Sequence, residues 1–231
     1  RWMVVDKSAR FITQRTSPKM ALLKTKIFDS TLRLSAPGMS ELKLPLFKIE
    51  GIPKMVEIWG ERCEALLADK QSESWISEFL GEKCNFVFMP DHTNRQVDQK
   101  YAIGKNQVAF SDGFPLLLIP ESSLKDLNSR IPEEISMKRF RPNLVVKNTL
   151  PYQEDNWRVI RIGECELQIA KPCSRCVLIT VDPETGKFSG REPLRTLAKY
   201  RKFNGEVVFG QNLIPRSSGK IEVGMKIEIL K

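Results

Sequence analysis

Residues 157–169, with the sequence WRVIRIGECELQI, decide the fold class of this chain. Apolar and polar residues alternate on both sides of the pair Gly163-Glu164, and a period of two is typical of half-buried β-strands. A two-residue connection that contains glycine favours a tight hairpin turn. The stretch therefore predicts two antiparallel strands, 157–162 and 165–169.

Short apolar or alternating runs bounded by proline and glycine predict further strands. These runs are residues 2–5, 21–27, 32–34, 56–59, 85–88, 177–181 and 220–229. The last run is broken at Gly224, as in a strand that turns the corner of a barrel.

Three helices are predicted from apolar residues at helical spacing. The first contains Trp75 and Phe79 and ends before Gly81. The second follows the start signal Ser122-Ser123, and the third runs over residues 193–202. Because strands outnumber helices, we expect a mainly β fold with a few helices (α+β), closed or nearly closed on itself.

The length of 231 residues allows one large or two modest domains, and a hydrophobic share of 41% is enough for a core. The longest apolar run, residues 116–119, is far shorter than the ~18 residues of a membrane helix, so we expect no integral membrane protein. The single histidine, His92, excludes a zinc site built from two histidines on one helix. Turn-forming residues between 88 and 97 predict a boundary, which gives domains 1–89 and 90–231.

The formal net charge of +9 indicates an anionic partner. The basic residues are scattered along the chain and interleaved with acidic ones, whereas nucleic-acid binding calls for a basic patch or stripe. We therefore expect a basic pocket for one anionic ligand, with neither a nucleic acid nor a membrane as partner.

The five cysteines are an odd number without dense spacing, so a secreted disulfide scaffold is not expected. This composition favours a reducing compartment, and we expect the cytoplasm.

The run KPCSRC, residues 171–176, holds the most informative pair of cysteines. A thiolate here, next to Lys171 and Arg175, is a candidate soft metal ligand or nucleophile. A structural zinc site would need Cys63, Cys84 or His92 to complete it. A thioredoxin-like redox pair needs a βαβ setting that is not predicted here, and two half-buried structural cysteines remain an open alternative.

Several further segments, taken in order with this run, resemble the MOSC domain of molybdenum-cofactor proteins. The resemblance is to the bacterial YcbX-like branch and to its eukaryotic relatives, the mitochondrial amidoxime-reducing components. Residues 1–5 and 13–15 resemble the N-terminal domain of the same family. The MOSC segments are FRPN (140–143), YQEDNW (152–157), IGE (162–164), KPCSRC (171–176), VDPETG (181–186), EPL (192–194) and FGQN (209–212).

The resemblance implies a MOSC β-barrel preceded by a β-barrel-like N-terminal domain that lacks its first strands. Cys176 matches the protein ligand of molybdenum, and Cys173 matches a companion cysteine that does not bind the metal. Asp112 matches an acidic residue near the metal pocket, so Cys176 and Asp112 are the expected catalytic residues.

The resemblance also implies the residues that hold the cofactor. Arg141, Asn143 and Ser174 match positions that bind the pyranopterin and its phosphate. Arg1 matches a cofactor-contacting arginine of the N-terminal domain, and Arg175, beside the metal ligand, is counted with them.

The function implied by the resemblance is a molybdenum-cofactor-dependent oxidoreductase that reduces N-hydroxylated compounds such as hydroxylamines, amidoximes and N-hydroxylated bases. The alternative is a cofactor carrier or sulfur-transfer module, because MOSC domains also resemble the C-terminal part of molybdenum-cofactor sulfurases. In those proteins the domain accompanies a pyridoxal-phosphate desulfurase, and pyridoxal phosphate binding is an expectation at the level of the family only.

Two departures from the family pattern bear on these expectations. A characteristic Pro-Val-Lys-Ser-like strand would precede Arg1, and the ferredoxin-like domain of some bacterial relatives is not found in this sequence. We therefore expect electrons to come from a separate flavin or iron-sulfur protein.

Overall fold

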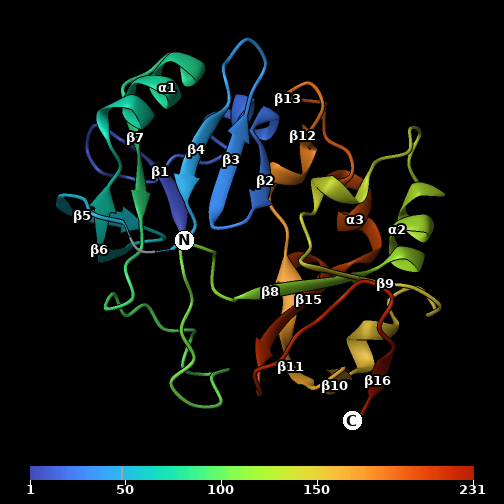
Figure 1. The fold of residues 1–231 in the computed structure, drawn as a ribbon. Coiled ribbons are helices and arrows are strands. Elements are labelled where there is room, and N and C mark those ends of the chain that lie inside the picture. Colours follow the sequence, from blue (N-terminus) through green and yellow to red (C-terminus); the bar gives the residue numbers. More distant parts are fainter. Residues whose placement is uncertain (48) are drawn as a thin grey trace. The chain divides into compact units, whose positions relative to one another are not determined.

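The computed structural model describes residues 1–47 and 49–231 of the chain (Figure 1). These residues form two compact units, a first unit of residues 1–95 with 181–188 and a second unit of residues 96–180 with 189–231. Strands predominate in the described residues, which confirms the expected mainly β fold with few helices. The domain boundary predicted between residues 89 and 90 stays a prediction. Within the described ranges, no helix is both long and apolar enough to cross a bilayer.

The first unit contains two antiparallel sheets and a short hairpin. One sheet has the order β1 (Trp2–Asp6), β7 (Cys84–Phe88), β6 (Glu61–Leu67) and β5 (Pro53–Ile58). The other has the order β2 (Lys24–Phe28), β3 (Thr31–Ser35) and β4 (Leu42–Pro45), and the hairpin pairs β12 (Val181–Asp182) with β13 (Lys187–Phe188).

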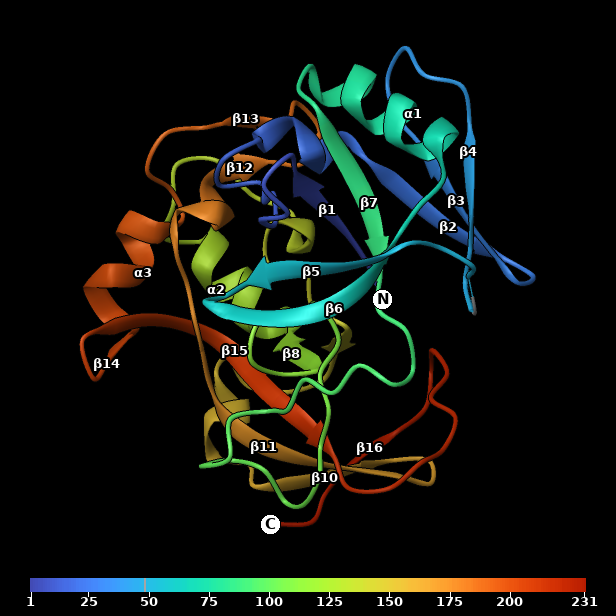
Figure 2. The same ribbon diagram turned by 90° about the vertical axis from the view of Figure 1, so that its left-hand side faces the viewer.

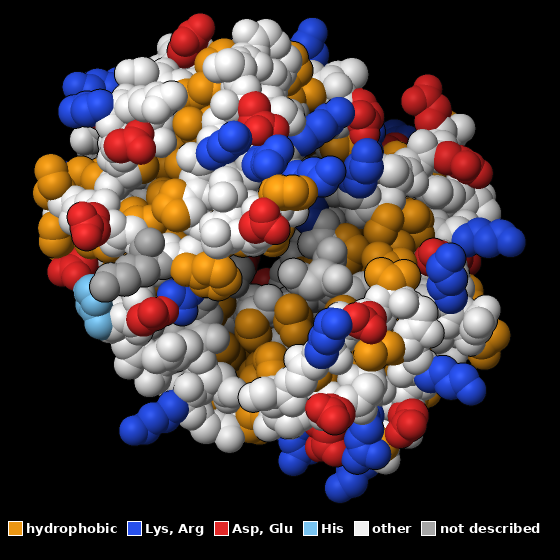
Figure 3. All heavy atoms as spheres, in the orientation of Figure 1, with side chains coloured by type: hydrophobic (Ala, Val, Ile, Leu, Met, Phe, Trp, Pro, Cys, Tyr) orange, Lys and Arg blue, Asp and Glu red, His pale blue; other side chains and the backbone are white. Residues whose placement is uncertain are grey.

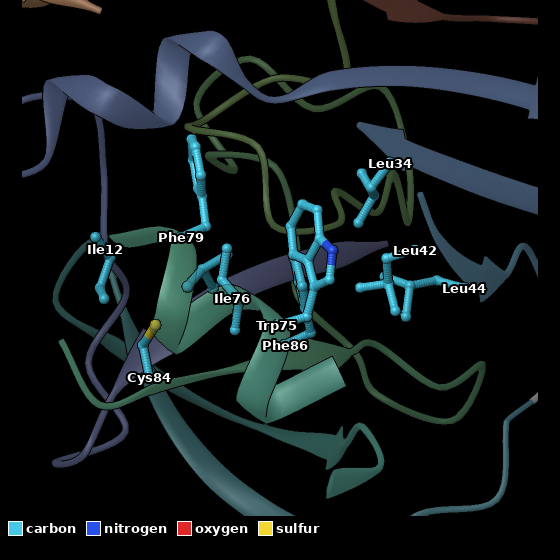
Figure 4. Packing of buried hydrophobic residues seen from close by; sticks show 10 residues of the cluster. Ile12, Leu34, Leu42, Leu44, Trp75, Ile76, Phe79, Cys84 and Phe86 are labelled. Carbon is cyan, nitrogen blue, oxygen red and sulfur yellow. The ribbon is translucent and has the colours of Figure 1, made fainter. Parts of the chain in front are cut away.

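Helix α1 (Lys70–Leu80) forms because its ends are capped and one face is apolar. The Asp69 side chain accepts a hydrogen bond from the Ser72 backbone N–H at 2.7 Å, and Gly81 ends the helix in the left-handed conformation, as predicted. Trp75 and Phe79 point into the core, where they pack among side chains from several strands (Figure 4). Alternation along β4 places Leu42 and Leu44 in this same core.

The second unit is built on one seven-stranded sheet. Its order is β16 (Ile227–Ile229), β10 (Val159–Ile162), β11 (Cys165–Ser174), β15 (Glu206–Pro215), β8 (Leu116–Pro120) and β9 (Leu144–Val146), with β14 (Lys202–Phe203) also paired to β15. Strands β8 and β9 are parallel, and the other pairs are antiparallel. The predicted hairpin is confirmed as β10 and β11 (Figure 2).

Three predicted strands are wrong in part. The first, residues 21–27, overlaps a 3-10 helix, Pro18–Leu22, and the strand β2 begins only at Lys24. Residues 177–180 form a 3-10 helix, Val177–Thr180, and only Val181–Asp182 is a strand. That apolar run does not alternate, so its periodicity could not separate a strand from a buried helical turn. Of residues 220–229, only β16 is a strand, because the Met225 N–H bonds to the Glu222 carbonyl and turns the chain before it.

The other two helices exist but differ at their ends from the prediction. Helix α2 (Glu121–Asn128) begins directly after Pro120, before the expected serine signal, because the Ser123 hydroxyl bonds to more distant groups instead of capping. Helix α3 (Leu194–Tyr200) is shorter than predicted, because the backbone of Arg201 leaves the helical conformation.

A β-bulge interrupts the pairing of β11 with β15. Pro172 pairs with Gln211 and Ser174 with Val208, so two residues of β15, Phe209 and Gly210, lie opposite Cys173. Gly210 has a φ of 78°, in the left-handed region. A Cβ atom there would lie 2.7 Å from the Leu118 carbonyl oxygen of β8, so the position requires glycine for both conformation and space.

We predict that Gly210→Ala destabilises the protein by about 3 kcal/mol, since it adds backbone strain to a backbone clash. The measurement is the free energy of unfolding in denaturant. The matched control is Gly205→Ala, because Gly205 has a φ of 85° but open space around its Cβ position. Equal losses for the two variants would contradict the steric part of this account.

Candidate functional site

Cys176 lies in the short connection between the end of β11 at Ser174 and the 3-10 helix Val177–Thr180. Its side chain is exposed and forms no disulfide. The sulfur is therefore accessible to a ligand from solvent. The bulge of β11 and β15 immediately precedes this connection and sets the direction in which it leaves the sheet.

Cys173, three residues earlier, has a different environment. It is half-buried, and its Sγ donates to the Ser174 carbonyl oxygen at 3.7 Å. Burial raises the pKa of the Cys173 thiol; Arg175 opposes this shift and Asp112 adds to it. The two cysteines are thus not equivalent, since one is exposed and the other is a half-buried thiol held toward its protonated form.

Arg175 connects the short segment that carries Cys176, here called the cysteine loop, to the rest of the second unit. Its Nε and Nη2 donate to the Phe209 carbonyl oxygen at 3.0 and 2.8 Å, and its Nη1 donates to the Phe140 carbonyl oxygen at 3.3 Å. Burial lowers the pKa of this guanidinium, and the charge of Arg141 lowers it further. Arg175 is therefore a positioning residue in this structure, and its contact with a cofactor stays a prediction.

Arg141, exposed and with a φ of 53°, follows directly on the Phe140 carbonyl that Arg175 holds. The structure therefore brings the segment 140–143 next to the cysteine loop. The left-handed conformation at a bulky residue is strained and marks this turn as a constrained feature.

Asn143 and Ser174 both form hydrogen bonds within the second unit. The Asn143 Oδ1 accepts from the Leu117 N–H at 2.9 Å, and the Asn143 N–H donates to the Leu117 carbonyl at 2.9 Å, so this residue lies against the start of β8. The Ser174 hydroxyl donates to Glu206 at 2.7 Å. Their predicted contacts with a pterin stay predictions.

Asp112 and Lys171 both act electrostatically on the Cys173 thiol, which places their charges near the bulge. The Lys171 Nζ lies 5.7 Å from the ring centre of Tyr101 and 5.9 Å from that of Phe114. The two rings meet edge to face. The two aromatic rings hold the ammonium group of Lys171 close to the KPCSRC segment, residues 171–176.

Arg1 belongs to the first unit, where its guanidinium forms an ion pair with Asp91. Its backbone carbonyl accepts from the Met89 N–H at 2.9 Å. The cofactor contact expected of Arg1 stays a prediction.

Sequence reasoning assigned no role to a group of charged residues that supports β15. Arg201 donates to both oxygens of Asp155 at 2.7 and 3.1 Å, and the buried Gln211 donates to the same carboxylate at 2.7 Å. The Arg201 guanidinium also lies over the Tyr152 ring, 4.3 Å from its centre. Asp155 lies in the matched segment 152–157, but its partners are 46 and 56 residues away, a distance that no local pattern signals.

Glu154, next to this ion pair, is completely buried. Ser123 donates to its two oxygens at 3.3 and 3.4 Å. Burial raises the pKa of Glu154 to about 7, the Glu154 backbone opposes the shift and Asp155 adds to it. This carboxyl therefore changes protonation near neutral pH.

We predict that Glu154→Gln removes a pH dependence of stability. Because the folded chain binds this proton more tightly than the unfolded chain, the protonated Glu154 side chain contributes fully to stability below its ordinary pKa of 4.5. This contribution is lost as the pH rises through about 7. The variant is expected to exceed the wild type in unfolding free energy by up to about 3 kcal/mol at pH 8, with the difference vanishing toward pH 4.5. A difference that does not change with pH in denaturant titrations would be inconsistent with a buried titrating group.

A zinc site was one alternative for the cysteine pair. Within each unit, no three described His, Cys, Asp or Glu side chains gather into a group that could hold a metal ion. The five cysteines are all free thiols.

Comparisons with known proteins agree with the order of motifs. Residues 105–228 match the family described as MOSC domain, and residues 1–83 match the MOSC N-terminal beta barrel domain. The chain is 34% identical to mitochondrial amidoxime-reducing component 1 of Mus musculus, over 99% of this chain and 71% of that protein. It is 35% identical to the protein of the same name from Danio rerio, over 96% of this chain and 71% of that protein. It is also 30% identical to the molybdenum cofactor sulfurase of Oryza sativa subsp. japonica, over 90% of this chain and 28% of that protein.

Proposed function

This chain belongs to the MOSC-domain family, and from that premise we propose that it is a molybdenum-cofactor-dependent reductase of N-hydroxylated compounds. The observation that carries the proposal is the exposed, unbridged sulfur of Cys176 at the end of the bulged strand. The similarity to amidoxime-reducing components over nearly the whole chain supports the same reaction class.

The donor set around Cys176 fits a molybdenum cofactor in its chemistry. An accessible thiolate is a soft anionic ligand, which suits a metal that also binds the sulfurs of a dithiolene. Positive charge from Arg141 and Lys171 suits the phosphate of a pterin, and an arginine guanidinium matches the geometry of phosphate oxygens. Cys176 would hold the metal, and Arg141, Asn143 and Ser174 would hold the pterin and its phosphate.

The overall reaction converts R–NHOH, two electrons and two protons into R–NH₂ and water. The cofactor supplies the two-electron, oxygen-accepting chemistry when it is bound. The chain's own residues bind and orient the reactants. Asp112, whose charge reaches the Cys173 thiol, is the proposed group for exchanging the protons that leave with oxygen as water.

The electrons are proposed to come from a separate flavin or iron-sulfur protein. The similarity to proteins named as components of an amidoxime-reducing system supports this assignment. Each turnover needs two electrons, which such a donor can supply.

The second candidate is a cofactor carrier or sulfur-transfer module. It is favoured by the similarity to the rice sulfurase, which extends over 90% of this chain. A carrier would bind the cofactor through the same residues but would show no catalytic reduction of N-hydroxylated compounds.

We predict that Cys176→Ala abolishes the reduction of a hydroxylamine by protein made in a host that synthesises the cofactor, because the exposed sulfur is the proposed metal ligand. Cys173→Ala, the matched control, is expected to keep most of the activity, since that thiol is half-buried. Molybdenum and pterin content and turnover with an artificial electron donor are the measurements.

Equal loss of activity in both cysteine variants would favour a paired-thiol site over a single metal ligand. A wild-type protein that carries the cofactor but never turns over would instead favour the carrier.

A further inference from the structure

The sheet of β2, β3 and β4 in the first unit brings together cations that are far apart in the sequence. Lys26 pairs with Arg33, and Arg33 pairs with Lys43, so three basic side chains stand in one row across the three strands. Lys24, two residues before Lys26, lies on the same face of β2. We call Lys24, Lys26, Arg33 and Lys43 the basic face, and Figure 3 shows Lys and Arg side chains gathered over this sheet.

The charges of the basic face are mostly not neutralised within the unit. Arg33 lies 3.7 Å from Glu41, but Lys24, Lys26 and Lys43 are exposed and have no carboxylate within ion-pair distance among the described residues. Like charges directly opposite in a sheet destabilise it. The row is therefore a feature that stability alone does not explain.

Protection of sheet edges explains only part of the pattern. Lysines on edge strands prevent unwanted pairing with other chains, and β2 and β4 are the edges of this sheet. Edge protection does not require a third cation on the central strand, directly opposite both. Arg33 also stacks over Phe28, with its guanidinium carbon 4.3 Å from the ring centre, so its charge is held on the same face.

Large apolar side chains are exposed at the end of the same sheet. Ile27 and Phe28, at the turn between β2 and β3, are 65% and 51% exposed, and Phe47, just after β4, is 69% exposed. The Leu46 N–H donates to the Ser30 carbonyl at 2.9 Å, which places the Phe47 segment beside that turn. We call Ile27, Phe28 and Phe47 the apolar tip; the β2–β3 turn is visible at the end of its strands in Figure 2.

We propose that the basic face and the apolar tip form a surface that docks on an anionic lipid bilayer. Cations next to exposed aromatic and aliphatic side chains are the combination that binds membrane interfaces, where the apolar groups enter the headgroup region. Lysine is depleted at protein–protein interfaces, whereas this face has three lysines and one arginine, which favours a lipid surface over an acidic protein. The proposal reverses our expectation that the chain has no membrane partner.

The test is binding of the full chain to vesicles of phosphatidylcholine, with and without phosphatidylserine, measured by co-sedimentation. We expect binding only when phosphatidylserine is present, and weaker binding as the salt concentration rises. The double variant Lys26→Gln with Lys43→Gln is expected to bind about 30-fold more weakly, the effect of two lysines near an anionic surface. Phe28→Ser with Phe47→Ser is expected to weaken binding but to keep its salt dependence.

The matched control is Lys105→Gln with Lys226→Gln, which removes the same charge from exposed positions of the second unit and should change binding little. Equal losses in the two lysine pairs, or equal binding to pure phosphatidylcholine, would overturn the proposal. Binding to polyglutamate that depends on Lys26 and Lys43, without binding to vesicles, would assign the face to an acidic protein instead. The readout does not depend on bound cofactor, so its failure is separate from failure of the reductase assignment.

Discussion

The bond between the Arg175 guanidinium and the Phe209 carbonyl is the interaction on which the candidate site depends. The bulge opposite Cys173 removes this carbonyl from the regular backbone hydrogen bonding between β11 and β15, because Phe209 and Gly210 share a single partner residue. An unpaired buried carbonyl would destabilise the strand, and Arg175 satisfies it while also reaching the Phe140 carbonyl. One side chain therefore joins β11, β15 and the turn that carries Arg141, and the exposed loop with Cys176 begins from this junction.

The same strand, β15, is held by the ion pair of Asp155 and Arg201 through the buried Gln211. Removing one partner of such a pair leaves the other charge buried and unpaired. This destabilises a protein more than replacing both partners with apolar residues does. Glu154 lies beside it and titrates near neutrality because of its burial. The strand that positions the cysteine loop is thus stabilised by polar contacts whose partners lie far apart in the sequence.

Much of the fold could be predicted from local patterns, because the β10–β11 hairpin and helix α1 carry their own signals in alternation and in a terminal glycine. The family resemblance implied different roles for Cys173 and Cys176; the two side chains differ in exposure, and their roles stay predictions. Local patterns could not show that Arg175 points inward to two carbonyls, since those partners lie 34 and 35 residues away. The basic face was missed for the same reason, because residues 24, 26, 33 and 43 appear scattered until the strand register aligns them.

The central claim is that the Cys176 sulfur is a ligand of molybdenum. X-ray absorption at the molybdenum edge, on protein isolated from a host that makes the cofactor, tests this most directly. The account predicts that the wild type has one more sulfur neighbour around the metal than Cys176→Ser, while Cys173→Ser matches the wild type. The same number of sulfur neighbours in the wild type and in Cys176→Ser would contradict it.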